Sequence, residues 1–342
     1  MGRTIDSCPR RRPPARHPDL TVIAKAANAG YRPSMLSRVS VAILLTLTPA
    51  VAAGQIFGAG ARTEFISGFG LRTFASVETR NRLLGRGTAA VDPGGPALRV
   101  RTTPVAIVYG LRARLSLVAV LPFVDKQLSF PGGAAQPFTV GAGGLGDALF
   151  LTKWRFYKRD QPFGTFQLAT EVGVKAPTGA HHLEDAEGQL LPAALQRGSG
   201  SWDPMANLLM TYVPAAGRGR WAFTGDIGIR LTTEANMVEV GNQVGYDGMV
   251  KYRVHPVRYP GRDTFLLLEI NGRWQDRARV GGGLASDSGG HVVYLSPCIQ
   301  FLLRRNLILE GGVQVPVIHD LNGTQLAPST RVLAGVRYII VP

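Results

Sequence analysis

Hydrophobic and polar residues alternate with a period of two along most of the chain beyond residue 54. In the stretch 144–157, which opens with a glycine turn, Phe150 and Trp154 lie on one face and Lys153 and Arg155 on the other. This alternation is typical of a β-strand whose two faces meet different surroundings. No long stretch has a helical period, so the pattern predicts an all-β protein.

About twelve segments of this kind follow one another, each of roughly ten residues or more, which is the length that a tilted strand needs to cross a membrane. They are expected near 64–80, 97–109, 112–123, 145–157, 164–177, 202–213, 219–232, 243–255, 264–275, 291–303, 306–317 and 329–341. No segment after the first 53 residues is apolar for long enough to form a membrane-spanning helix.

The connections between these segments alternate between short and long. Short ones are expected near 110–111, 158–163, 214–218, 256–263 and 304–305, and long ones near 81–96, 124–144, 178–201, 233–242, 276–290 and 318–328. Outer-membrane barrels have short periplasmic turns and longer external loops. We therefore predict an antiparallel, up-and-down transmembrane β-barrel of about twelve strands. A soluble β-sandwich, with shorter strands and a shared core, is the alternative fold.

One face of each segment is apolar and would contact lipid. Six aromatic residues on this face fall near the strand ends that would be periplasmic, where a girdle of amphipathic rings is expected. They are Trp154, Phe156, Tyr212, Trp221, Tyr252 and Tyr338.

The opposite faces carry charges, which would line the lumen of a barrel. The candidate lumen-lining residues are Lys153, Arg155, Glu171, Lys175, Asp226, Arg230, Lys251, Arg253, Glu269, Arg273, Arg331 and Arg337. Paired across strands, they would close the interior with salt bridges. Unpaired around a water path, they would give a narrow pore a weak preference for anions. A barrel of this size has room for a slim channel or a filled core, and the sequence leaves both open.

The first 53 residues differ from the rest. Residues 39–53 combine a preceding Arg38, an apolar centre, Pro49 and small residues before a cleavage site, as an export signal does. We expect residues 1–34 to be an over-called start or a disordered leader, 35–53 a signal peptide cleaved near residue 53, and 54–342 the barrel. A membrane anchor is the alternative reading, but the apolar run is short for a spanning helix.

The formal net charge of +15 does not point to nucleic acid. Residues 1–53 hold eight Lys and Arg against two acids, and the basic residues that follow are dispersed. Because nucleic-acid binding needs a localised basic surface, no nucleic-acid partner is expected.

Short glycine-led motifs carry a family resemblance. Gly144-Leu-Gly-Asp147 followed by Lys153-Trp-Arg-Phe156, then Pro177-Thr-Gly179, and Gly200-Ser-Trp-Asp203 resemble the pattern of the outer-membrane proteins grouped as "putative MetA-pathway of phenol degradation". The resemblance implies an outer-membrane β-barrel associated with uptake of small, often aromatic or apolar compounds. It implies no catalytic residues. The ending at Pro342 departs from the terminal aromatic residue common in such barrels.

The sequence offers little support for catalysis. The histidines after residue 54 fall in loops or at strand ends, without a serine in register, and Gly198-Ser-Gly-Ser201 precedes no helix, unlike a nucleophile elbow. His181, His182 and the acids at 184, 185 and 187 match no known metal site. Gly141–Gly146 lacks the lysine and helix of a phosphate loop. No catalytic residue, metal or cofactor is predicted, and Cys298 is expected to serve as a small apolar residue.

The function predicted is an outer-membrane channel for passive uptake of small solutes, aromatic or apolar ones included. The expected partners are outer-membrane lipid, the solute and the barrel-assembly machinery. Pro131, Gly132, Gly133, Phe138 and the loop 178–201 are the candidate gate. The alternatives are a closed structural or interaction barrel without transport and, less favoured, a barrel-embedded hydrolase.

Overall fold

The computed structural model describes residues 56–64, 66–85, 88–90, 95–130, 138–185, 188–255 and 262–340. The expected leader and signal peptide, and the candidate gate residues Pro131, Gly132 and Gly133, lie outside this range. Within it, no helix is long and apolar enough to cross a membrane.

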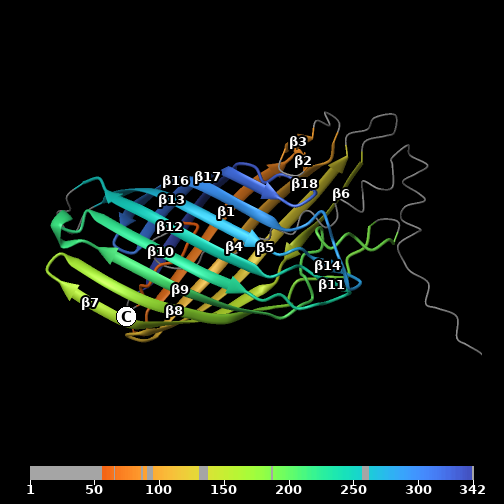
Figure 1. Ribbon diagram of the computed structural model, residues 1–342. Helices are drawn as coiled ribbons and strands as arrows, with labels where there is room; N and C mark the ends of the chain where they lie inside the picture. Colours follow the sequence, from red (N-terminus) through yellow and green to blue (C-terminus); the bar gives the residue numbers. More distant parts are fainter. Residues whose placement is uncertain are drawn as a thin grey trace, which may run out of the picture.

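Twelve antiparallel strands form a closed barrel (Figure 1). They are β1 (Phe69–Arg80), β4 (Ala97–Arg112), β5 (Leu115–Phe130), β7 (Ala148–Gln161), β8 (Gly164–Ala176), β9 (Asp203–Val213), β10 (Trp221–Arg230), β12 (Gln243–Arg253), β13 (Asp263–Gln275), β16 (Gly290–Arg304), β17 (Leu307–Leu321) and β19 (Arg331–Ile340). Each strand pairs with the next in this order. The last strand pairs with the first, from Phe69 opposite Ile340 to Glu78 opposite Arg331. The predicted fold class and strand number are confirmed.

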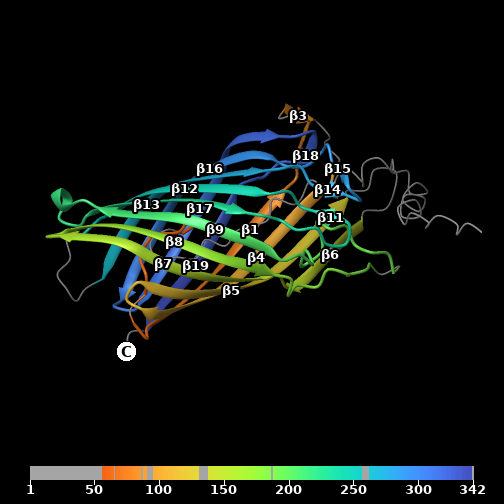
Figure 2. The ribbon, with the colours of Figure 1, turned by 60° about the horizontal axis from the view of Figure 1, so that its bottom comes forward.

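The two ends of the barrel differ, as the connection lengths predict. One end has tight turns, such as 113–114 and 305–306. The other carries long connections with small sheets of their own (Figures 1 and 2). These sheets contain β2 (Leu83–Gly85), β3 (Thr88–Ala90) and β18 (Thr324–Leu326), and β11 (Val238–Glu239), β14 (Arg279–Val280) and β15 (Gly283–Leu284). By the rule for bacterial barrels, the short-turn end is periplasmic and the long-loop end is external.

The predicted loop 124–144 is wrong. Strand β5 continues to Phe130, and a further strand, β6 (Phe138–Leu145), pairs with its outer half. As a result β5 pairs with β7 only from Leu115 to Val120. The glycines at 141, 143 and 144 hide this strand in the sequence, because they remove the side chains that would show its period.

The outer surface of the strands is apolar at the predicted positions. Mid-strand residues such as Ile227, Val172 and Leu268 are about half exposed, at 53%, 50% and 47%. Near the short-turn end the outward aromatic residues form a band of ring contacts, including Trp221 with Tyr252 at 4.6 Å between ring centroids. This pattern fits lipid around the strands and headgroups around the band.

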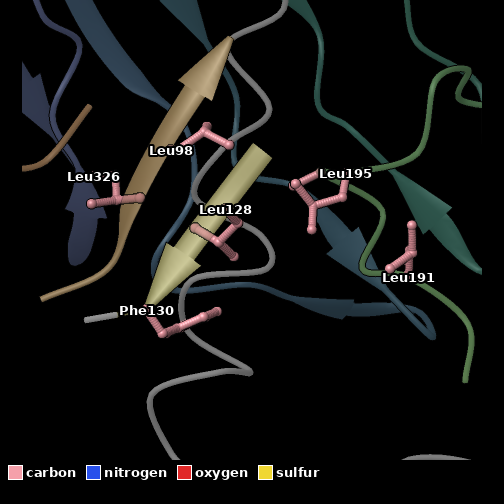
Figure 3. Packing of buried hydrophobic residues seen from close by; sticks show 7 residues of the cluster. Leu98, Leu128, Phe130, Leu191, Leu195 and Leu326 are labelled. Carbon is pink, nitrogen blue, oxygen red and sulfur yellow. The ribbon is translucent and has the colours of Figure 1, made fainter. Parts of the chain in front are cut away.

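The largest apolar cluster lies inside the external mouth. Leu98 and Leu128 point inward from β4 and β5 and pack against Leu191 and Leu195 of the loop 178–201, as Figure 3 shows. All four are at most 4% exposed. The loop is therefore packed into the mouth rather than standing away from it.

Candidate functional site

A coil of nine residues, 56–64, lies inside the barrel and is called here the inner segment. Its backbone is held by carboxylates of the wall. Glu269 on β13 accepts hydrogen bonds from the amides of Ile56 and Phe57 at 2.6 and 2.9 Å, and Asp226 on β10 accepts one from Ala59 at 2.7 Å. Because the segment has no strand partner, these side chains satisfy amides that would otherwise be unpaired.

The remaining anchors lead the inner segment towards the short-turn end. Lys153 on β7 donates to the carbonyl of Gly60 at 2.9 Å, Thr211 accepts from the amide of Ala61 at 2.9 Å, and Ser116 accepts from the amide of Glu64 at 3.0 Å. Lys153 also forms an ion pair with Glu171 at 3.0 Å, and both side chains are 2% exposed.

Small residues let the inner segment pass close to the wall. Ala59 and Ala61 are 8% and 0% exposed and pack with Ala169 and Leu209 of β8 and β9. Ile56 is fully buried among apolar residues of β12, β13, β16 and β19, Cys298 among them. The sequence 58–61, Gly-Ala-Gly-Ala, has no strand period, so the alternation could not reveal it.

A charged triad supports the beginning of the inner segment, at Ile56. Arg72 is paired with Glu310, and Arg337 lies 3.5 Å from the same carboxylate. Arg72 also donates to the carbonyl of Ile56 at 2.9 Å. Arg72 and Glu310 were missed in the sequence, although both occupy inward positions of their strands.

Towards the periplasmic end, three further candidate residues have partners in the wall. Arg253 pairs with Asp263 at 2.5 Å, and Lys251 donates to Gln300 at 2.9 Å while its ammonium lies 4.1 Å from the ring centroid of Phe265. Arg155 donates to the carbonyl of Ala113 at 2.6 Å, in the turn before β5.

Above the inner segment the lumen contains a cavity of about 200 Å³. On the side of the cavity formed by β1 and β19, Arg331 and Arg80 both pair with Glu78, at 2.8 and 2.7 Å. Arg230 and Arg273 face it from β10 and β13. A smaller cavity of about 70 Å³ lies beside the inner segment and shares both arginines.

Lys175 stands at the external side of this cavity, between two carboxylates. Its ammonium lies 3.2 Å from Asp147 and 2.8 Å from Asp203 and donates to the hydroxyls of Ser199 and Ser201. A serine beside a lysine can be a nucleophile only if the amine accepts its proton. Here the amine is ion-paired twice and acts as a donor, so the arrangement holds the loop in place.

The glycine-led motifs meet at this junction. Asp147 accepts from the amides of Gly179 and Ser199 at 3.1 and 2.8 Å, and Thr178 donates to the carbonyl of Gly146 at 2.9 Å. A Cβ on Gly179 would lie 2.8 Å from the backbone of Gly198. Gly146, Gly179 and Gly198, which are up to 52 residues apart in the sequence, thus form one contact that seats the loop 178–201 in the mouth.

The remaining candidates from the sequence are the histidine pair and Phe138. The rings of His181 and His182 lie 4.5 Å apart, and no metal-binding group of three His, Cys, Asp or Glu occurs among the described residues, which exclude Glu187. Phe138 stacks on Phe130 with ring centroids 4.6 Å apart.

The model of the family described as "Putative MetA-pathway of phenol degradation" matches residues 74–317. The chain belongs to this family. The resemblance noted at the glycine-led motifs is thereby confirmed.

One solved structure supports the MetA-pathway family fold, and a second is more distantly similar. An outer membrane channel from Pseudomonas putida F1 superposes with a TM-score of 0.59 at 17% identity, covering 82% of this chain and 98% of that one. The β domain of the Bordetella autotransporter BrkA gives 0.42 at 10% identity, covering 80% and 99%. No curated protein matches the chain. The barrel, its apolar belt and the family place this protein in the bacterial outer membrane, as predicted.

Proposed function

We propose that this MetA-pathway family protein is an outer-membrane channel for passive uptake of small solutes, and that the inner segment closes it. The observation that carries the proposal is the coil of residues 56–64 held in the lumen by Glu269, Asp226 and Lys153. The charged lumen residues then have two roles, since some pair within the wall and others hold the segment.

The anchors favour a closure that can be released. Side-chain hydrogen bonds hold the inner segment, whereas a strand ladder would make it part of the wall. If the expected signal peptide is cleaved near residue 53, the segment is also the start of the mature chain. A chain end can leave the lumen without breaking any strand of the barrel.

Planar-bilayer conductance of the refolded barrel tests this proposal. The double variant Glu269→Gln with Asp226→Asn weakens three of the segment's backbone hydrogen bonds, because a neutral amide is a poorer acceptor than a carboxylate. We expect rare, small openings from the wild type and frequent, larger conductance steps from the variant.

Asp263→Asn is the matched control for this experiment. Asp263 is a buried lumen carboxylate, 1% exposed, whose partners are Arg253 and the amide of Thr264 rather than the inner segment. Equal conductance of the double variant and this control would refute closure by the segment. A folded barrel that stays silent in every variant would favour a closed structural or interaction barrel.

The loop in the external mouth defines the solute's route in this proposal. Lys126 donates to the carbonyls of Ala194 and Gln196 at 3.1 and 2.7 Å, which ties the loop to β5. Solutes would enter past this loop. We also propose that the barrel-assembly machinery inserts the protein through its closing strand, β19.

A further inference from the structure

The 200 Å³ cavity has two walls of different chemistry. Inward residues of β4, β5 and β7 give an apolar wall, with Val100, Pro104, Pro122, Val124 and Leu149 on it. These strands are consecutive in the barrel, and β10, β12 and β13 face them across the lumen. The wall on that side is polar and contains the arginines described above.

Polar atoms on the second wall have no partner. Arg230, Thr232 and Gln243 are 6%, 8% and 3% exposed, and Arg230 lies opposite Gln243 in the pairing of β10 with β12. Within the described part of the chain, the Nε of Arg230, the hydroxyl of Thr232 and both amide atoms of Gln243 make no hydrogen bond. Buried polar groups are normally paired, so several unpaired ones close together indicate a place for a ligand.

The charges around this group favour an anion. Seven basic and four acidic side chains line the cavity. Of the acids, Glu78 is paired with two arginines, and Asp147 and Asp203 with Lys175. Arg273 lies close enough to repel Arg230, so an anion between them would relieve this repulsion. Asp247 lines both cavities, and it accepts a hydrogen bond from Asn271 at 2.6 Å.

We propose that this cavity binds a small carboxylate with an apolar body. The carboxylate would take hydrogen bonds from Arg230, Thr232 and the amide of Gln243, and the body would lie against β4, β5 and β7. A guanidinium is suited to this role because it can donate two parallel hydrogen bonds to one carboxylate. This inference rests on the proposed channel function for its physiological meaning, since it names the class of solute.

Gly245 provides the space for such a ligand. It lines both cavities, and a Cβ at this position would meet nothing within 4 Å. Gly248, three residues further along β12, points to the outside of the barrel and has equally open space. A larger residue at position 245 therefore fills the cavity, whereas the same substitution at position 248 replaces a glycine of the same strand and leaves the cavity unchanged.

Isothermal titration calorimetry on the folded, full-length barrel in detergent tests the proposal, with hexanoate as the probe. Hexanamide has the same shape without the charge, and acetate has the charge without the apolar body. We expect hexanoate to bind at least about tenfold more tightly than either. Hexanamide loses a charge-assisted hydrogen bond, which commonly costs that much, and acetate lacks four carbons that hexanoate would bury against the apolar wall. Equal binding of hexanoate and hexanamide would overturn the proposal.

Variants locate the site. Arg230→Gln should weaken hexanoate binding at least about tenfold, and Gly245→Leu should abolish it by filling the cavity. Gly248→Leu and Arg101→Gln, where Arg101 is an exposed partner of Asp125, should bind like the wild type. Unchanged binding in folded Arg230→Gln and Gly245→Leu would refute the site. Folding is checked by the gel shift on heating.

The carboxylate site and the channel function can be refuted independently by these experiments. The titration needs no open pore, so a barrel that binds hexanoate but never conducts would sink only the channel proposal. A barrel that conducts after release of the inner segment but shows no difference between hexanoate and hexanamide would sink only the carboxylate site.

Discussion

At the scale of single residues, the lumen depends on buried charges that compensate one another. Lys153 and Glu171 are each 2% exposed and 3.0 Å apart, and a second contact ties Lys153 to the inner segment. A buried charge is tolerated only with its partner, so removing one member should cost more than removing both.

We predict that Lys153→Met lowers the free energy of unfolding by about 3–5 kcal/mol, since it leaves Glu171 as an uncompensated buried charge. The double variant Lys153→Met with Glu171→Leu should recover most of this loss. Urea unfolding in lipid vesicles, followed by tryptophan fluorescence, measures both.

The surface pair of Lys158 with Asp160, 2.6 Å apart at the short-turn end, is the control for this prediction. Its side chains are 39% and 58% exposed, so Lys158→Met should leave stability unchanged. If Lys153→Met is as mild as Lys158→Met, the Lys153–Glu171 pair does not stabilise the barrel.

Which residues carry charge on the inner face could be predicted at this scale, but their partners could not. Alternation places Glu171 and Lys153 on the same face of neighbouring strands, and a sequence gives no register between them. Asp226 and Glu269 show the limit more clearly, because their partners are backbone amides of a coil that no periodicity marks.

At the scale of elements, the glycine junction fixes the loop in the external mouth. Gly179 lies against Gly198 and Gly146 so closely that a Cβ would be within 3 Å of both backbones. Gly146 and Gly179, which belong to the motifs that carry the family resemblance, are therefore explained by close packing of three chain segments.

We predict that Gly179→Ala loosens the loop 178–201 without opening the barrel, because the new methyl group must displace backbone atoms. Trypsin should then cut after Arg197, a partly buried residue of this loop, several-fold faster than in the wild type. Gly248→Ala, with open space on the outer face, should be cut at the wild-type rate. An unchanged rate in Gly179→Ala would show that the junction does not hold the loop.

The elements that could be predicted are the ones whose two faces meet different media. Most of the twelve wall strands have lipid on one side and a polar lumen on the other, so their alternation is regular; the inward residues of β4, β5 and β7 at the cavity are the apolar exception. Strand β6 and the inner segment lack an alternating pattern for different reasons. Strand β6 is largely glycine between 141 and 145, and residues 56–64 are surrounded by the wall. The prediction failed where this contrast of media is lost.

At the scale of the whole molecule, the outward face of the barrel should behave as a surface in contact with lipid rather than water. Leu268 is at mid-strand on β13 and is 47% exposed, and Leu284 on the external β15 is 64% exposed. In water both would tolerate lysine equally well. In a membrane only Leu268 lies in hydrocarbon, where a charged side chain is costly.

We therefore predict that Leu268→Lys lowers the free energy of unfolding from lipid vesicles by about 2–4 kcal/mol, the cost measured for lysine or arginine near a bilayer's midplane. Leu284→Lys should leave it unchanged, because its side chain is in water before and after the substitution. The difference between the variants should shrink in detergent, whose small micelles let the lysine reach water. Equal stability of both variants in vesicles would mean that lipid does not surround β13, and the orientation of the whole barrel would have to be reconsidered.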